Sequence, residues 1–321
     1  MKAIVYEKYG SPDVLHLKEV EKPIPKDDEV LIRVHAASIN SLDWHFLRAN
    51  PFFIRLMAGG FLKPKNAILG VDVAGQVEAV GRNVRQFRPG DEVFGFGDNT
   101  FAEYACAKEN ALVVKPPNLE FEQVAAIPVA ALTALQGLRD KGTIQAGQKV
   151  LIQGASGGVG MFAVQIAKSF GAEVTGVCST RNLEMVHSLG ADHVIDYKKE
   201  DFTRNGQQYD LILAANGYHP ISDYLRALSP EGIYVVAGGS MLQLFQAVLK
   251  ARRVSKTGSQ KIFVVSTVRS QKDLFFMKEL LESGKVAPVI DGCYPLSKTA
   301  EAFRYFENEH AKGKVVITIK D

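Results

Sequence analysis

The sequence predicts two domains: a compact, partly closed β-barrel and a doubly wound α/β domain built on a parallel sheet. The first third consists of short β-like runs separated by Gly and Pro, such as "EVLIRVHAAS" and "VAGQVEAVG". From "KVLIQG" onward, apolar strands alternate with helical segments such as "GVGMFAVQIAKSFG", which is a βαβ pattern. Because these strands are apolar on both faces, we expect a parallel sheet covered by helices.

Three segments follow from this change of pattern. The β-rich pattern extends over 1–117, and the Rossmann-type alternation of helix and strand occupies 118–264. The remaining 265–321 contains a helix, a short strand, a second helix and the last strand, "GKVVITIK".

Composition narrows the classes of function. The chain has 321 residues, 46% of them hydrophobic, and a net charge of only +3, which favours neither nucleic acid nor a membrane surface as partner. Met1 leads directly into a strand without a secretory signal, and no apolar run is long enough to cross a bilayer, so we expect a cytoplasmic protein. The three cysteines lie far apart without CxxC spacing, which indicates neither a disulfide framework nor a structural zinc.

A glycine-rich turn joins the first strand and helix of the α/β domain. "GASGGVG" has the spacing Gly-x-x-Gly-x-x-Gly, and its βαβ context predicts dinucleotide binding. Glycines permit the tight turn, the close approach of backbone amides to a pyrophosphate and the packing of helix on sheet. The residues expected to hold the dinucleotide here are Gly154, Ser156, Gly157, Gly158, Val159 and Gly160.

The segment after the second strand predicts which dinucleotide binds. A carboxylate there would favour NAD, but the chain offers Ser179, Thr180 and Arg181, with Tyr197 after the next strand. Hydroxyls and a guanidinium suit the 2′-phosphate of NADPH. We therefore expect NADPH as the cofactor, although the same residues also suit a solvated turn with an incidental arginine.

These motifs together resemble the medium-chain dehydrogenase/reductase superfamily along essentially the whole chain. The similarity includes "LGVDVAGQVEAVG", "RPGDEVFGF", the glycine turn and "LGADHVIDY". The resemblance implies a GroES-like β-barrel domain beside the Rossmann domain, a C-terminal segment that rejoins the barrel, and a homodimer.

Many members of that superfamily hold a catalytic zinc. Asn40 stands where those members have a cysteine ligand, and Val71 and Asp72 stand where they have a His-Glu pair. Valine cannot bind a metal and asparagine is a poor zinc ligand, so we expect no metal. The pattern is similar to the zinc-free quinone oxidoreductase branch, whose Asn-x-x-Asp is Asn40 to Asp43 here.

The resemblance implies hydride transfer from NADPH to a small acceptor. Without a Lewis acid, the acceptor should already be electrophilic, as quinones and α,β-unsaturated carbonyls are. The candidate catalytic residues are Asn40, Asp43 and His45, although Asp43 also suits a helix cap and His45 also suits an inert surface position. Trp44, Phe46, Phe52 and Phe53 form either a wall for a flat acceptor or ordinary core.

Further cofactor contacts come from the resemblance alone. Each of these residues also has a plausible packing role; they are Thr133, Asn216, Gly238, Gly239, Ser240, Phe263, Val264, Val265 and Lys314. Two other functions stay open at this point: an NADPH-binding sensor or structural protein with little turnover, and a dehydrogenase or reductase of small alcohols or aldehydes.

Overall fold

The computed structural model describes residues 1–321 except 51–53, 58–59, 240–242, 245, 252–258, 309–310 and 320–321. The chain divides into two compact units. The barrel unit comprises Met1–Val129, Arg269–Glu282 and Pro288–Asp321, and the nucleotide unit comprises Ala130–Val268 and Ser283–Ala287. Within the described part of the chain, no helix has the length and apolarity needed to cross a membrane.

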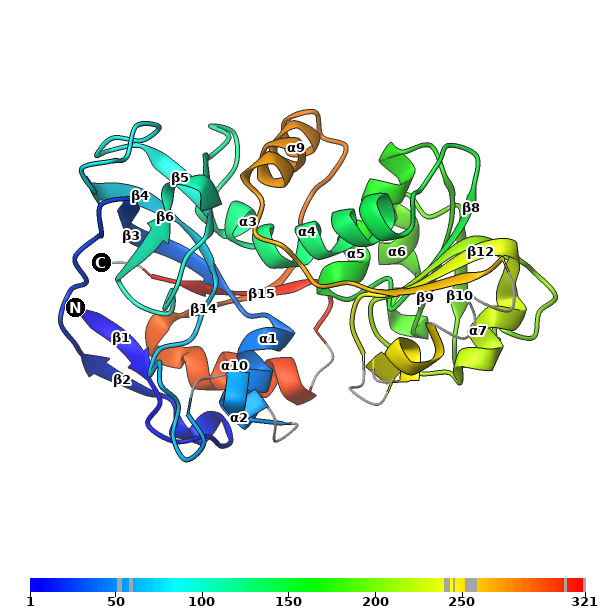
Figure 1. Ribbon diagram of the computed structural model, residues 1–321, viewed down its shortest axis with the longest axis horizontal. Coiled ribbons are helices and arrows are strands. Elements are labelled where there is room, and N and C mark those ends of the chain that lie inside the picture. Colours follow the sequence, from blue (N-terminus) through cyan, green and yellow to red (C-terminus); the bar gives the residue numbers. More distant parts are fainter. Residues whose placement is uncertain are drawn as a thin grey trace. The chain divides into compact units, whose positions relative to one another are not determined.

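The barrel unit is built mainly from antiparallel strands (Figure 1). Its strands are β1 (Lys2–Val5), β2 (His16–Glu19), β3 (Glu29–Ser38), β4 (Asp72–Val80), β5 (Glu92–Phe96), β6 (Tyr104–Lys108), β7 (Leu112–Val114), β14 (Ile290–Pro295) and β15 (Lys314–Thr318). Seven of them form one sheet in the order β14-β15-β3-β4-β5-β7, with β6 paired to β3, while β1 and β2 form a separate pair. Its helices are α1 (Ser41–Arg48), α2 (Ile54–Met57), α3 (Phe121–Ala125), α9 (Gln271–Glu282) and α10 (Thr299–Asn308).

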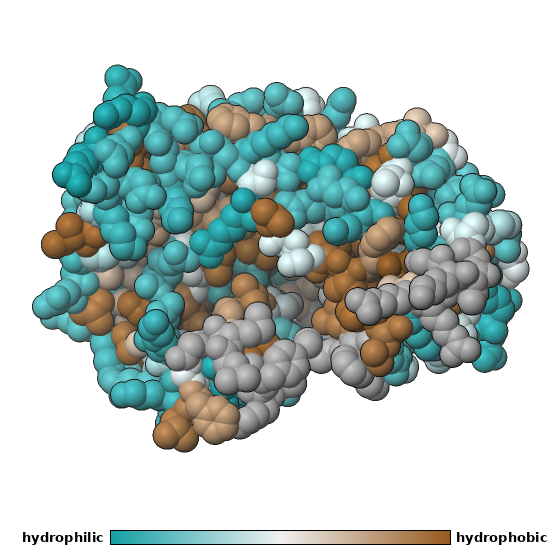
Figure 2. Space-filling model, viewed as in Figure 1, coloured by the Kyte–Doolittle hydropathy of each residue, from teal (hydrophilic) through white to brown (hydrophobic). Residues whose placement is uncertain are grey.

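Strand β3 is the centre of this unit. It pairs with β4, β6 and β15, so its side chains are largely buried along its ten residues. Gly75 permits the close crossing of β4, because a Cβ there would lie 2.1 Å from the carbonyl oxygen of Arg33. The apolar side chains of β3 and its neighbours form one buried cluster. Hydrophilic residues cover much of the molecular face shown in Figure 2.

The nucleotide unit contains one six-stranded sheet whose strands are all parallel, which confirms the predicted doubly wound domain. The strands are β8 (Lys149–Gln153), β9 (Glu173–Cys178), β10 (His193–Asp196), β11 (Tyr209–Ala214), β12 (Leu228–Val236) and β13 (Lys261–Val264), in the order β10-β9-β8-β11-β12-β13. The helices are α4 (Pro128–Gln136), which begins at the end of the barrel unit's first segment, α5 (Gly158–Ser169), α6 (Leu183–Ser188) and α7 (Ile221–Ala227). Because the strands are parallel, all their carboxyl ends lie along one edge of the sheet.

Candidate active site

The glycine turn between β8 and α5 is shaped by its own backbone. Gly154 follows β8 with a φ of 77°, a conformation that favours glycine. A Cβ on Gly160 would lie 2.0 Å from the carbonyl oxygen of Gly154, so no side chain fits there. These two glycines allow strand and helix to approach closely.

The start of α5 presents open backbone. Gly157 is the N-cap of this 12-residue helix, which begins with Gly158 and Val159. A Cβ on Gly157 would meet no atom closer than 3.4 Å, so space remains beside the turn. The first N–H groups of a helix lack partners within the helix and carry the positive end of its dipole. The turn therefore fits the pyrophosphate of a dinucleotide.

The turn after β9 carries the residues predicted to select NADPH. Ser179 and Arg181 flank Thr180, whose Oγ1 donates a hydrogen bond of 2.6 Å to Oδ2 of Asp196 at the end of β10. This hydrogen bond is the main reason that the pKa of Asp196 lies below its ordinary value. Tyr197 follows with 57% of its surface exposed. A carboxylate therefore lies one strand away, engaged by a hydroxyl of the predicted phosphate-binding turn.

The fold places the remaining predicted cofactor residues of this unit on α4 and near the carboxyl ends of three strands. Thr133 lies on α4, with its Oγ1 2.6 Å from Oγ1 of Thr267. The others lie at or just beyond the carboxyl ends of β11, β12 and β13; they are Asn216, Gly238, Gly239, Phe263, Val264 and Val265. Gly238 has no room for a side chain, since a Cβ would lie 2.3 Å from the carbonyl oxygen of Ala215. Ser240 lies outside the described residues.

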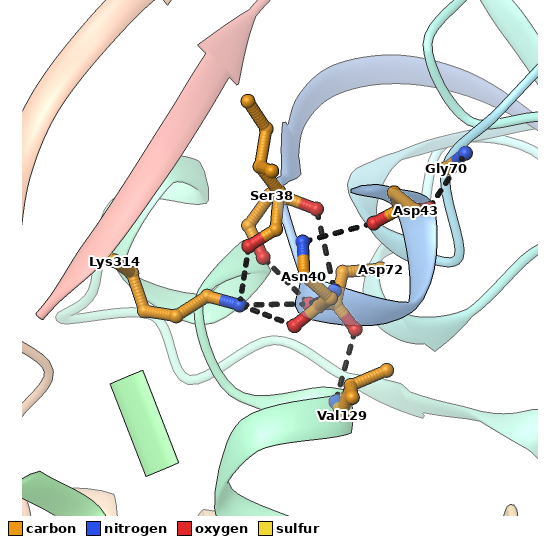
Figure 3. A network of polar contacts seen from close by, with 8 residues as sticks. Ser38, Asn40, Asp43, Gly70, Asp72, Val129 and Lys314 are labelled. Atoms are coloured by element: carbon orange, nitrogen blue, oxygen red, sulfur yellow. Dashed lines mark hydrogen bonds and ion pairs between the residues drawn. The ribbon is translucent and has the colours of Figure 1, made fainter. Parts of the chain in front are cut away.

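A buried polar network lies in the barrel unit, at the ends of β3, β4 and β15 (Figure 3). Asp72 is completely buried. Its Oδ2 accepts hydrogen bonds from Ser38 Oγ at 2.5 Å and from Asn40 Nδ2 at 2.8 Å. Its Oδ1 accepts the backbone N–H of Val129 at 2.9 Å. Both oxygens of this carboxylate are therefore satisfied within the barrel unit.

Lys314 is the cation of this network. Its side chain is 3% exposed, and its Nζ lies 2.5 Å from Asn40 Oδ1 and 3.5 Å from Asp72 Oδ2. Burial lowers the pKa of Lys314, while the charge of Asp72 acts in the opposite direction. Lys314, implied by the resemblance to lie near the cofactor, directs its ammonium into this network.

The candidate catalytic residues Asn40 and Asp43 are both engaged inside the barrel unit. The amide of Asn40 contacts Asp72 and Lys314, and only 6% of the residue is exposed. Asp43 Oδ2 accepts the backbone N–H of Asn40 at 2.9 Å, and its Oδ1 accepts that of Gly70 at 3.1 Å. Burial raises the pKa of Asp43 to about 7. Asp43 thus forms the helix cap that the sequence left open as its alternative role.

His45 is the more accessible of the candidates. Its Nδ1 lies 2.7 Å from the carbonyl oxygen of Asn50, and its ring packs edge-on to Trp44 at 4.9 Å. The indole N–H of Trp44 donates to Glu307 Oε1 on α10 at 2.5 Å. Of the other three aromatic residues predicted to form a wall, Phe46 is partly buried on α1, whereas Phe52 and Phe53 lie outside the described residues.

A cavity of about 300 Å³ lies beside α1, entirely within the barrel unit. Its lining combines apolar and polar residues and comprises Tyr6, Leu42, Asp43, Phe46, Asn66, Ile68, Leu69, Gly70, Val71, Asp98, Asn99 and Arg269. Arg269 pairs with Asp98 at 3.0 Å. A mostly apolar hollow with a few polar groups is typical of a small-molecule site.

Comparison with known proteins assigns the family. Two family descriptions match the chain: alcohol dehydrogenase GroES-like domain over residues 26–117 and zinc-binding dehydrogenase over residues 189–317. The quinone-oxidoreductase QR1 of Triphysaria versicolor is 34% identical over 334 residues, which cover 99% of this chain and 98% of that protein. The chain belongs to the medium-chain dehydrogenase/reductase superfamily.

Two further members of this superfamily are also similar. An NADPH-dependent alkenal/one oxidoreductase of Arabidopsis thaliana is 36% identical over 338 residues, covering 99% of this chain and 79% of that protein. The solved structure of the quinone oxidoreductase from Coxiella burnetii matches with a TM-score of 0.88 at 28% identity, covering 100% of this chain and 99% of that one. The two-domain fold expected of a medium-chain dehydrogenase/reductase is therefore confirmed.

The zinc-ligand positions of the superfamily hold Asn40, Val71 and Asp72 in this chain. Asn40 and Asp72 hydrogen-bond to one another and contact Lys314. Across the described residues, no three or more His, Cys, Asp or Glu side chains come together as a possible metal site. The donor set therefore does not fit a catalytic zinc.

Three residues of these sites are not predicted as site residues by the sequence. Ser38 and Asp72 belong to the buried network, and Asn182, 4% exposed, donates from Nδ2 to Ser156 Oγ at 2.8 Å. The sequence pattern marks Asp72 only as a residue at a zinc-ligand position, and Ser38 lies inside an ordinary strand pattern. Asn182 follows directly after Ser179, Thr180 and Arg181, which was the one signal available for it.

Proposed function

We propose that this chain is an NADPH-dependent, zinc-independent oxidoreductase that delivers hydride to quinones or α,β-unsaturated carbonyls. The observation that carries the proposal is that Asn40 and Asp72, at zinc-ligand positions, are buried, hydrogen-bonded to one another and in contact with the ammonium of Lys314. Such a site lacks the ligands for a Lewis acid, so it suits an acceptor that is electrophilic before it binds.

The nucleotide unit supports the coenzyme part of the proposal. The open backbone at Gly157 and the start of α5 would bind the pyrophosphate, and Ser179 and Arg181 would contact the 2′-phosphate. The bound nicotinamide would supply the hydride. The preference for NADPH should depend on how strongly the Thr180 hydroxyl hydrogen-bonds to the carboxylate of Asp196.

The barrel unit supports the acceptor part. The cavity beside α1 would receive a flat acceptor against Leu42 and Phe46, with Tyr6 among its lining residues. Apolar walls exclude water and position the acceptor, which contributes to catalysis without a metal. His45, partly exposed on the same helix, is a candidate to relay a proton to the reduced product.

A panel experiment tests the proposal. Purified protein is mixed with NADPH or NADH and with quinones, enones and simple ketones, and oxidation is followed at the nicotinamide absorbance band. We expect quinones or enones to be reduced with NADPH, at a rate unaffected by chelator and without stoichiometric zinc. Tight NADPH binding without acceptor-dependent oxidation would favour a sensor or structural protein, and chelator-sensitive turnover of alcohols would favour a zinc dehydrogenase.

We also propose that the protein forms a homodimer, as members of the superfamily commonly do. Sedimentation at micromolar concentration tests this, and a monomer at all concentrations would contradict it.

A further inference from the structure

We propose that Lys314 is a positioning residue that serves as the resident cation of the buried network around Asn40 and Asp72. Its ammonium holds the oxygens of Asn40 and Asp72 together and offsets buried negative charge, as a metal ion would do in such a place. The proposal rests on the proposed function only for its activity measurements, since its stability measurements require no acceptor.

Every ammonium proton of Lys314 has an acceptor. A lysine ammonium has three N–H donors and no acceptor. Three oxygens surround Nζ of Lys314: Asn40 Oδ1 at 2.5 Å, the carbonyl oxygen of Ile39 at 3.1 Å and Asp72 Oδ2 at 3.5 Å. Side-chain, backbone and carboxylate oxygens thus converge on one positive centre, which is the arrangement of a cation site.

Lys314 also lies close to buried acidic side chains. Asp72 is 0% exposed and Asp43 is 1% exposed, so two acidic side chains are buried in one part of the unit. Both act electrostatically on Lys314, which is itself buried. A buried charge without an opposite partner is strongly unfavourable. Lys314 supplies that opposite charge from the start of β15, far from both acids in sequence.

The ammonium of Lys314 is connected to the cavity through α1 and the segment before β4. Asn40, which accepts from Lys314, lies directly before α1, and Asp43 in the first turn of α1 binds the backbone N–H of Gly70. Asp43 and Gly70 line the cavity, and Asp72 follows directly after another lining residue. Displacing the ammonium would therefore release α1 and the segment before β4, which together form much of the cavity wall.

Chemical rescue tests the proposal. Lys314→Ala removes three methylene carbons and the ammonium, which n-propylammonium can replace. We expect the variant to lose about a hundredfold in kcat/KM, because a misplaced wall misaligns the acceptor. We expect added n-propylammonium to raise the kcat/KM of the variant about tenfold. It should also raise the thermal midpoint of the variant, because it binds preferentially to the folded state. Uncharged 1-propanol, of similar length, and tetramethylammonium, which lacks N–H donors, should restore neither.

Lys115→Ala is the matched control. Lys115 is a second buried lysine of the barrel unit, bonded to the carbonyl oxygens of Pro116 and Leu119 and paired with Glu92. Its loss should lower the thermal midpoint without changing kcat/KM of the folded protein. Equal rescue of Lys314→Ala by 1-propanol, or wild-type kcat/KM without any cation, would overturn the proposal.

A double-mutant cycle keeps the proposal testable if Lys314→Ala does not fold. Lys314→Met, Asp72→Asn and the double variant are compared by denaturant unfolding. We expect the double variant to be more stable than the sum of the two single losses predicts, because each single change leaves one buried charge unpaired. Additive losses would overturn the proposal. A wild-type protein inactive with every acceptor would contradict only the proposed function, because these unfolding measurements would still decide the role of Lys314.

Discussion

The glycine turn of the nucleotide unit and the polar network of the barrel unit are constructed in opposite ways. The turn is local: it lies between Gly154 and Gly160, and its decisive property is the absence of side chains at its glycines. The network is non-local: 32 residues separate Asn40 from Asp72, and 274 separate Asn40 from Lys314. It depends on side-chain charges that balance one another in a buried place.

The two sites are therefore sensitive to different kinds of substitution. A backbone site is damaged by added atoms, whatever their charge, because there is no room for them. A buried charged network is damaged by any change that leaves one member unpaired, even when the volume is unchanged. The predictions below separate steric effects from charge effects.

The largest expected effect is steric. Gly160→Ala places a Cβ 2.0 Å from the carbonyl oxygen of Gly154, so α5 must shift. We expect the free energy of unfolding to fall by about 3 kcal/mol, with a large loss of NADPH affinity. Denaturant unfolding and calorimetric titration measure the two effects.

Gly157→Ala is the control for that prediction. Its Cβ meets nothing closer than 3.4 Å, so stability should change by no more than about 0.5 kcal/mol. NADPH affinity should still fall, because the added methyl lies where the pyrophosphate is expected. Unchanged NADPH affinity in Gly157→Ala would place the pyrophosphate elsewhere.

The next effect is one of charge and pH. The pKa of Asp43 is raised to about 7, so the folded protein keeps this proton at pH values where the unfolded chain has released it. The associated stability is present at low pH and is lost as the pH rises toward 7. Asp43→Asn should remove about 3 kcal/mol of the fall in unfolding free energy between pH 4 and pH 7.

An exposed acid provides the comparison for Asp43. The pKa of Asp13 is lowered by its hydrogen bond to Arg304, so Asp13→Asn should change the slope of stability against pH in the opposite direction. Unfolding curves measured at several pH values test both variants. Identical slopes for Asp43→Asn and wild type would show that Asp43 does not titrate in this range.

A smaller effect concerns the coenzyme. Arg181→Gln keeps a polar side chain but removes the guanidinium charge. We expect the preference for NADPH over NADH to fall about tenfold, equal to about 1.4 kcal/mol, through weaker NADPH binding alone. Titration with both coenzymes measures it, and equal weakening of NADH binding would argue against a 2′-phosphate contact.

The smallest expected effect also concerns the preference for NADPH over NADH. Thr180→Val removes the hydroxyl that donates to Asp196, leaving the carboxylate less engaged. We expect the preference for NADPH to fall about threefold, the value of one modest hydrogen bond. A preference that stays at the wild-type value would show that Asp196 does not face the ribose.

Features that depend on neighbouring residues could be predicted from the sequence. The apolar strands of the α/β half predicted a parallel sheet, and the glycine spacing predicted the turn between β8 and α5, because both follow from local backbone geometry and periodic burial. The contacts of Lys314 with Asn40 and Asp72, and of Asp196 with Thr180, depend instead on how the folded chain brings its strands together. The Lys314 contacts arise because β15 pairs with β3, a strand far away in the sequence. The contact of Asp196 with Thr180 arises because the successive strands β9 and β10 lie side by side and end together.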